Sequence, residues 1–395
     1  MNIALQINES CQVCAFCKGL HVINDEMLKI KHIRYSELKI PFTRTFSHGS
    51  ANRDETETVI VQVVDESGLI GYGEGCPRSY VTGESVETVF KFFKKHRTSI
   101  SHIKTLDEIK SYLSECQAEI DENPAGWCAM ELALLDLLAK TEQVNVEKLL
   151  GITKKQPEYI YSAILGDSEP EVFHQLFQQY RQLGFVDYKI KLSNNFEKDR
   201  KKLRCMNACI NEITVRADAN NLWDSTSSAI SYLNDLSFDF YAIEEPIQSK
   251  QIVDLQFIAA EIQCKVILDE SLLRFEQIEQ LKQNPNCWIV NARVSKYGGI
   301  LRSLKIIDEL VKSDIDIIVG AHVGETSLLT RSALLLADKA SDKLTAQEGG
   351  FSTHLLTKDP FQPNLKIGRA GKFGGGTILD CMNKPGFGVN KINSD

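Results

Sequence analysis

Charged residues follow short apolar runs at nearly even intervals in the second half of this chain. They are Lys191, Asp218, Glu244, Asp269 and Lys296. Consecutive members lie about 26 residues apart, the length of one strand, one helix and two loops in a βαβ unit. In a parallel barrel of such units, the residue just past each strand points into the mouth where active sites lie. The spacing therefore predicts that these side chains converge at one end of a barrel.

Short apolar strands alternate with amphipathic helices from about Tyr159 onward, which predicts a parallel sheet. The expected strands end near Ala163, Lys191, Asp218, Glu244, Asp269, Lys296, His322 and Gln347. Eight such strands close a barrel. Before this region, three strand patterns are followed by three helical patterns without βαβ repetition, at 28–33, 58–64, 69–74, 85–94, 106–120 and 125–140. These indicate a separate α+β domain.

The chain is thus divided into four segments. Residues 1–27 are expected to be a poorly ordered extension, residues 28–150 the α+β domain and residues 151–358 the barrel. Residues 359–395 are rich in Gly and Pro and hold too little helix for another βα unit. We expect this last segment to return to the α+β domain.

The cysteines favour a reducing compartment. There are 11 of them, an odd and scattered set that does not form a secreted disulfide framework. One local group, Cys11, Cys14, Cys17 and His21, has a spacing that zinc or iron sites also use. It lies in the N-terminal extension without the context of a paired zinc motif, so we interpret it as a part of that extension.

Composition narrows the class of partner. The formal net charge of −8 disfavours nucleic acid, which needs a basic surface. No apolar stretch approaches the roughly 18 residues that span a bilayer. We therefore expect a cytoplasmic protein that acts on a small molecule, without nucleic acid or membrane partners. Assembly into a homo-oligomer is left open.

Three of the phased residues are acids from successive strands. Asp218, Glu244 and Asp269 would bring hard carboxylate oxygens to one rigid edge, which suits Mg²⁺ with open positions for water or substrate. Mn²⁺ is the main alternative, and zinc is disfavoured because no histidine or cysteine stands at these positions. Any one acid alone would be a solvated loop residue more readily than a ligand. Their joint phasing favours a metal site.

The lysines are interpreted as acid–base groups. Lys189 and Lys191 flank one residue and therefore point to the same, inner face of their strand. Lowering a lysine pKa from about 10.4 to near neutrality costs about 4 kcal/mol, and the neighbouring ammonium of Lys189 together with a metal would help to lower that of Lys191. A surface lysine pair is the alternative. Lys296, taken as the end of a strand over 291–296, would face Lys191 across the barrel and complete a two-base site.

These motifs resemble the enolase superfamily and, within it, the muconate lactonizing enzyme subgroup related to mandelate racemase. The resemblance rests on Lys189 and Lys191, Asp218-Ala219-Asn220, Glu244-Glu245-Pro246, Asp269-Glu270-Ser271 and Lys296 before Gly-Gly. It implies a modified TIM barrel, (β/α)7β, under an N-terminal α+β capping domain. It also implies Mg²⁺ at the three acids, supported by Asn220, Glu245 and Glu270, and removal of a proton α to a carboxylate through a metal-stabilised enediolate.

The subgroup contains cycloisomerases, o-succinylbenzoate synthases, N-acylamino acid racemases and dipeptide epimerases. We expect racemisation or epimerisation of an amino-acid derivative or dipeptide, with cycloisomerisation or syn β-elimination, which need one base, as the alternative. Dipeptide epimerases resembling this chain typically carry Asp-x-Asp after the eighth strand, where this chain has the single acid Glu348. Further expected substrate contacts are His322, which could instead hold Glu325, then Glu325 itself, and Arg78, Tyr80 and His48 in the capping loops.

Two other classes of protein fit this sequence less well than an isomerase. A Schiff-base aldolase would use one lysine covalently, but the three phased acids argue against it. A barrel kept only for binding should have lost at least one of the five charges, and all are present.

Overall fold

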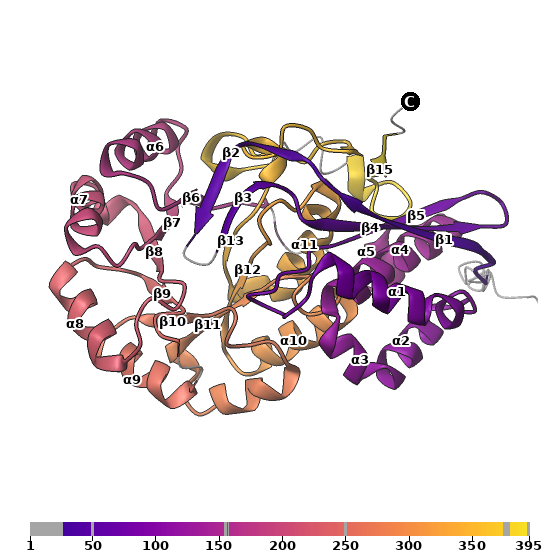
Figure 1. Ribbon diagram of the computed structural model, residues 1–395, viewed down its shortest axis with the longest axis horizontal. Coiled ribbons are helices and arrows are strands. Elements are labelled where there is room, and N and C mark those ends of the chain that lie inside the picture. The colour runs from indigo at the N-terminus through magenta and orange to yellow at the C-terminus, as the bar shows by residue number, and fades with distance from the viewer. Residues whose placement is uncertain are drawn as a thin grey trace, which may run out of the picture.

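An eight-stranded parallel sheet forms the centre of the computed structural model, which describes residues 27–48, 51–153, 156, 158–248, 251–373 and 380–392, without the side chains of 46–48 and 51–52 (Figure 1). The strands neighbour one another in chain order: β6 (Ala163–Leu165), β7 (Asp187–Lys191), β8 (Thr214–Asp218), β9 (Ala242–Glu244), β10 (Lys265–Leu268), β11 (Trp288–Ala292), β12 (Asp316–Val319) and β13 (Leu344–Gln347). The backbone N–H of Ser162 donates to the carbonyl of Gln347 over 2.8 Å. The last strand thereby meets the residue before the first, and the sheet closes into a barrel.

Helices cover the outside of the barrel between successive strands. They are α6 (Pro170–Gln182), α7 (Phe196–Asn207), α8 (Thr226–Leu236), α9 (Ile252–Ile262), the 3₁₀ helix η2 (Phe275–Leu281), α10 (Ile300–Lys312) and α11 (Ser327–Ala340). Shorter 3₁₀ turns are η1 (Ile210–Glu212), η3 (Pro285–Cys287), η4 (Ser341–Lys343), η5 (Phe351–Thr353) and η6 (Arg369–Gly371). The predicted modified TIM barrel, (β/α)7β, is confirmed. Within the described residues, no helix has both the length and the apolar character needed to cross a membrane.

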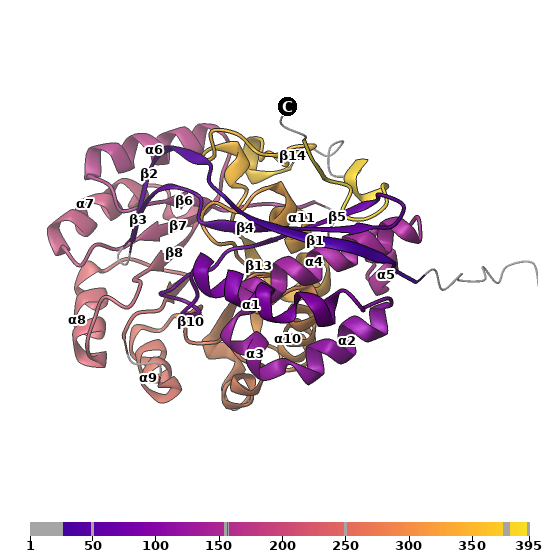
Figure 2. The same cartoon turned by 45° about the vertical axis from the view of Figure 1, so that its right-hand side comes forward.

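The N-terminal elements form an α+β layer beside the barrel, as predicted (Figures 1 and 2). An antiparallel sheet has the order β1 (Ile30–Leu38), β4 (Thr58–Asp65), β5 (Ile70–Gly75). The hairpin β2 (Pro41–His48) and β3 (Ala51–Glu55) lies over the β6 side of the barrel in both views. The helices are α1 (Val86–Ile100), α2 (Leu106–Glu115), α3 (Gln117–Glu122), α4 (Pro124–Thr141) and α5 (Val146–Leu150).

Helix α4 packs against β5 so closely that only glycines fit on the facing side of the strand. A Cβ built on Gly71, Gly73 or Gly75 would lie 2.1, 1.8 or 2.0 Å from a backbone carbonyl oxygen of α4. Every residue from Pro124 to Lys140 is buried. The helix was predicted, but with a single apolar face; its other faces are also covered because α4 contacts α1, α2, α3, α5 and α10 as well as the sheet.

Buried acids join this layer to the barrel by accepting hydrogen bonds at helix N-termini. Glu74 at the end of β5 accepts from the backbone N–H and hydroxyl of Thr326 (2.9 and 2.6 Å), where α11 begins. Glu131 of α4 accepts from the backbone N–H of Leu301 (3.0 Å) in the first turn of α10. A carboxylate satisfies the free N–H groups there and interacts favourably with the helix dipole. The α+β layer is thus held at a fixed place on the barrel mouth.

The end of the chain lies against the α+β layer. The short strands β14 (Phe361–Gln362) and β15 (Asn390–Lys391) pair with each other. The backbone N–H of Phe387 donates to Asp136 of α4 (2.9 Å), and Gly386 exchanges backbone hydrogen bonds with Val144 and Val146.

The close packing of β5 on α4 predicts a large effect of one added methyl group. Gly73→Ala should lower the free energy of unfolding by about 3 kcal/mol or more, since its Cβ meets the rigid carbonyl of Ala129 rather than a side chain that can move. Urea titration followed by circular dichroism measures the change. Gly166→Ala is the matched control, because a Cβ there meets nothing within 4 Å. Equal loss in both variants would contradict this explanation.

Candidate active site

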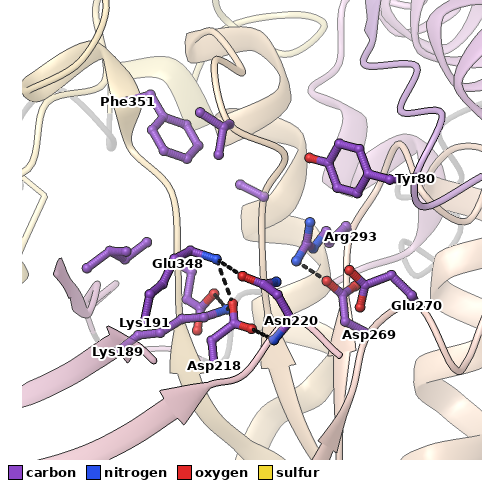
Figure 3. Close-up of a pocket in the computed structure, with 13 residues that line it drawn as sticks. Tyr80, Lys189, Lys191, Asp218, Asn220, Asp269, Glu270, Arg293, Glu348 and Phe351 are labelled. Carbon is purple, nitrogen blue, oxygen red and sulfur yellow. Dashed lines mark hydrogen bonds and ion pairs between the residues drawn. The ribbon is translucent and has the colours of Figure 1, made fainter. Parts of the chain in front are cut away.

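A pocket of about 510 Å³, open to solvent, lies at the carboxyl ends of the barrel strands. Its charged walls come from residues at or just past the strand ends, and Tyr80 enters from the cap (Figure 3). Its apolar walls are Ile164, Ala321, Val323 and Phe351. Lys189, Lys191, Asp218, Asn220, Asp269, Glu270, Glu348 and Tyr80 from the predicted set line it, together with Arg293. The barrel therefore brings most of the predicted residues to one place.

Lys189 and Lys191 lie at the end of β7 and both point into the barrel. The Nζ atom of Lys191 is 3.0 Å from Asp218 Oδ2 and donates to Asn220 Oδ1 over 2.6 Å. The Nζ atom of Lys189 is 2.6 Å from Glu244 Oε2 and 3.2 Å from Asp218 Oδ2. Burial alone would lower the pKa of Lys189, but the surrounding carboxylates outweigh it and hold the pKa well above its usual value. Lys189 is thus a fixed positive charge beside Lys191.

Asp218, Glu244 and Asp269 end or directly follow the consecutive strands β8, β9 and β10, and all three are buried. In the described part of the chain, no three acidic, histidine or cysteine side chains lie close enough together to hold an ion as they stand. Lys189 instead contacts Asp218 and Glu244, while Arg293 contacts Asp269 and lies 3.8 Å from Glu244.

The donor set itself fits a divalent cation. The three carboxylates supply hard oxygens from neighbouring strand ends, the type of ligand that Mg²⁺ prefers. Burial, with the nearby acids as smaller contributions, raises the pKa of Glu244 to about 8 even though Lys189 opposes the shift. A divalent cation beside Glu244 would favour the charged form of this buried carboxyl.

Glu245 and Asn220 support these acids. Glu245 accepts hydrogen bonds from the backbone N–H groups of Asp269 (2.6 Å) and Ser271 (2.8 Å), which fixes the turn after β10. The backbone N–H of Asn220 donates to Asp218 Oδ1 over 3.0 Å. Glu270 lines the pocket next to Asp269, and burial raises its pKa to about 8.

Lys296 occupies a different place from the one expected. Strand β11 ends at Ala292, and residues 293–299 form turns, so Lys296 lies four residues beyond the strand and not at its end. Its side chain is 0% exposed and does not line the pocket. Its Nζ atom donates to the carbonyls of Asp269 (2.9 Å) and Asn291 (2.5 Å) and to Asp269 Oδ1 (3.0 Å). Lys296 ties the turns after β10 and β11 together.

Arg293 is the residue from this segment that enters the pocket, and sequence reasoning missed it. It is paired with Asp269, and its side chain is 12% exposed. Arg293 is the first residue after the run 288–292, which is apolar except for Asn291. Counting from the end of that run would have placed Arg293 at the mouth, whereas counting back from the Gly-Gly pair selected Lys296. Phe351, the first aromatic residue after β13, was missed as well.

Glu348 lines the pocket but is fully engaged with basic neighbours. It lies 2.5 Å from Arg216 Nη1 and 3.1 Å from Lys189 Nζ. Burial would raise the pKa of Glu348, but Lys189 and Arg216 outweigh it and hold the pKa well below its usual value. Arg216 in turn pairs with Asp187 (2.7 Å) and is fully buried. This network was not predicted, and in it each carboxylate oxygen of Glu348 accepts a hydrogen bond from a basic side chain.

His322 and Glu325 lie just behind the wall formed by Ala321 and Val323. Glu325 accepts a hydrogen bond from the backbone N–H of His322 over 2.6 Å, so the pair fixes the turn after β12. The imidazole is 1% exposed, and neither ring nitrogen has a hydrogen-bond partner among the described residues. Neither residue lines the pocket. This geometry favours the supporting role over the substrate contact.

The capping loops contribute Tyr80 but not Arg78. Arg78 is fully buried and donates to the carbonyls of Glu57 (2.7 Å), Pro77 (2.6 Å) and Val323 (2.7 Å). It bridges the cap and the turn after β12 in place of the expected substrate contact. Tyr80 lines the pocket. The side chain of His48, and all of Cys11, Cys14, Cys17 and His21, lie outside the described residues.

The buried imidazole of His322 predicts a pH dependence of stability. Burial, and to a smaller extent Arg293 and Arg78, lowers its pKa well below 6.5. In the unfolded chain a histidine takes up a proton near pH 6.5. Stability should therefore be complete above pH 6.5 and fall below it, by up to about 1.4 kcal/mol per pH unit from this residue.

Urea titrations between pH 6.5 and 5 test this expectation. His322→Gln should make the loss of stability per pH unit smaller than in the wild type. His102→Gln, on the surface, controls for removal of a histidine. An unchanged pH slope in His322→Gln would show that the imidazole is not kept neutral by the fold.

Comparison with known proteins identifies the family to which the chain belongs. Residues 172–390 match the family described as "Enolase C-terminal domain-like", and residues 36–151 match "Mandelate racemase / muconate lactonizing enzyme, N-terminal domain". The chain is 27% identical over 317 residues to a hydrophobic dipeptide epimerase of Enterococcus faecalis (78% of this chain, 87% of the relative). It is 25% identical over 372 residues to an N-succinyl-L-Arg/Lys racemase of Bacillus cereus (93% and 96%).

An o-succinylbenzoate synthase of Listeria innocua is 25% identical over 288 residues (71% of this chain, 75% of the relative). Among solved structures, the dipeptide epimerase from Cytophaga hutchinsonii, complexed with Mg and the dipeptide D-Ala-L-Val, superposes with a TM-score of 0.81. It is 24% identical and covers 92% of this chain and 96% of that chain, which shows the shared fold. The chain belongs to the mandelate racemase and muconate lactonizing enzyme family of the enolase superfamily, and it is an enzyme of that superfamily.

Proposed function

We propose that this enzyme removes the proton α to the carboxylate of a small substrate, with Lys191 as the group that takes the proton. One observation carries the proposal: Lys191 lines the pocket and its Nζ atom lies beside Asp218 (3.0 Å) and Asn220 (2.6 Å). Racemases and epimerases, to which the chain is similar, must break this C–H bond. The proton-accepting amine therefore stands where the acids of the barrel mouth gather.

Mg²⁺ is the metal we propose for Asp218, Glu244 and Asp269, with Mn²⁺ as an alternative. A bound divalent cation would stabilise the negative charge that grows on the substrate carboxylate as the α-proton leaves. Lys189 adds a fixed positive charge 3.2 Å from Asp218 and 2.6 Å from Glu244. Glu245 and Asn220 hold the acids, and Tyr80 and Phe351 are proposed to contact the rest of the substrate.

Two outcomes of proton removal are proposed. Racemisation or epimerisation of an amino-acid derivative or dipeptide is the first, and it needs proton carriers on both sides of the α-carbon. Cycloisomerisation or syn β-elimination is the second, and it needs a proton carrier on one side only. The second is favoured by one observation, namely that Arg293, and not Lys296, lines the pocket.

We further propose a division of the chain at residues 27, 150 and 358 into extension, cap, barrel and returning C-terminal segment. We also propose a cytoplasmic enzyme with a small-molecule substrate and without nucleic acid or membrane partners. The net charge of −8 argues against nucleic acid, and the scattered cysteines favour a reducing compartment. A homo-oligomer is still an open prediction.

Proton exchange tests the proposed function. The enzyme is incubated with MgCl₂ in deuterium oxide and a panel of N-acylated amino acids, dipeptides, hydroxy acids and unsaturated acids. NMR should show loss of the α-proton signal for at least one class. Lys191→Met should slow this exchange by roughly 100-fold or more, the usual contribution of a general base.

Lys91→Met, at an exposed position on α1, is the matched control and should exchange at the wild-type rate. Absence of exchange with every class of acid would defeat the proposal. So would wild-type exchange by Lys191→Met, since it would place the base elsewhere.

Metal binding can be tested without turnover. Mg²⁺ at about 100 times its dissociation constant should stabilise the metal-free protein against thermal unfolding by about 2.7 kcal/mol. Asp218→Asn, Glu244→Gln and Asp269→Asn should each remove most of this increment, whatever their own stability. A melting temperature of the wild type that does not respond to Mg²⁺ would contradict the proposed metal site.

A further inference from the structure

We infer that Arg293 is the charged side chain that faces Lys191 across the substrate, and that Lys296 is a positioning residue. The site then carries a transferable proton on one side of the α-carbon only. This inference rests on the proposed function, because it takes Lys191 as the base. It gives a role to Arg293, which the sequence motifs did not identify, and it predicts the stereochemical course of the reaction.

Arg293 and Lys191 lie on opposite walls of the barrel. Arg293 follows β11, four strands away from β7 in the order of an eight-stranded barrel, so it and Lys191 come from opposite walls. Both line the pocket, and Figure 3 shows their side chains entering it from opposite sides. A substrate above Asp218 and Asp269 would lie between them.

Arg293 has N–H donors that are not all used within the protein. Its guanidinium is paired with Asp269, and Glu244 lies 3.8 Å from Nη2. Its Nε–H is buried and has no hydrogen-bond partner among the described residues. A buried donor without a partner costs free energy. Arg293 also lines the pocket with 12% of its side chain exposed, so an anionic or carbonyl oxygen of a substrate can accept a hydrogen bond from the exposed part of the guanidinium.

Lys296, in contrast, has no free hydrogen-bond donor left. An ammonium group has three N–H donors. The donors of Lys296 are used by the carbonyl oxygens of Asp269 and Asn291 and by Asp269 Oδ1, at 2.9, 2.5 and 3.0 Å. With an exposure of 0%, this group would have to give up these bonds and turn toward the pocket to reach a substrate. Its contacts instead fix the backbone on which Asp269 and Arg293 stand.

The chemistry follows from the two side chains that remain. A guanidinium keeps its charge in proteins and donates hydrogen bonds in a planar fork, so it binds oxygen anions but is a poor proton acceptor. The neutral amine of Lys191 takes the α-proton, and the electron pair of the C–H bond is left on the substrate. In a β-hydroxy acid, the bond between Cβ and the hydroxyl oxygen can then break. The electron pair from the C–H bond forms the C=C bond, and the Lys191 ammonium gives its proton to the leaving oxygen. Otherwise the proton, or a deuteron, returns to the face from which it came.

The stereochemistry of exchange tests this inference. Single enantiomers of N-acetylamino acids, and β-hydroxy acids, are incubated with the wild type and MgCl₂ in deuterium oxide. We expect α-deuterium with retained configuration, or elimination, and no inverted product. Arg293→Lys places an amine on the opposite wall and should raise the rate of inversion at least roughly tenfold. Formation of inverted product by the wild type as fast as exchange would overturn the inference.

Binding of succinate in the presence of Mg²⁺, measured by titration calorimetry, decides the inference independently of turnover. Arg293→Met should weaken binding roughly tenfold or more, since it removes a charged donor. Lys296→Met should mainly lower the melting temperature, and Lys91→Met should change neither. Equal binding by the wild type and Arg293→Met, including none by either, would overturn the inference. A wild type that exchanges no proton would defeat the proposed function alone and leave this comparison standing.

Discussion

Mutual repulsion among buried acids at one end of a parallel barrel is the constraint on which the rest of this site depends. Asp218, Glu244, Asp269 and Glu348 are almost completely removed from water, where negative charges strongly repel one another. Lys189 and Arg293 lie between them, each touching more than one carboxylate. Lys191, Lys296 and Arg216 pair with these acids as well, and we propose that a metal ion binds among them and that negative charge develops there on a substrate.

The cap covers one side of this charged site and contributes Tyr80 to the wall of the pocket. Its position is fixed by backbone packing of β5 glycines on α4 and by Glu74 and Glu131, which bind the first turns of α11 and α10. The cap then places Tyr80 at the pocket opposite apolar groups such as Phe351. A cap fixed in this way would let the pocket discriminate among substrates by the shape of the groups that lie far from the reacting carbon.

The fold and the polar floor could be predicted because a barrel repeats. The spacing of Lys191, Asp218 and Glu244 follows strand ends that recur with one βα unit, so their convergence could be read from the chain. Lys296 shows the limit of that reasoning. Strand β11 ends at Ala292, whereas the sequence predicted that it would end at Lys296. The residue that follows the strand and lines the pocket is therefore Arg293, three residues before the predicted lysine. Partners such as Arg216 with Glu348 depend on contacts across the barrel that no local pattern records.

We infer that the side chain facing Lys191 across the substrate is Arg293. A crystal structure of the enzyme with Mg²⁺ and a bound carboxylate, such as succinate or an N-acetylamino acid, tests it most directly. We expect the ligand to lie between Lys191 and Arg293, with a guanidinium N–H donating to a ligand oxygen and Lys296 Nζ still bonded to the carbonyls of Asp269 and Asn291. A Lys296 side chain released from those carbonyls and directed at the α-carbon of the ligand would contradict it.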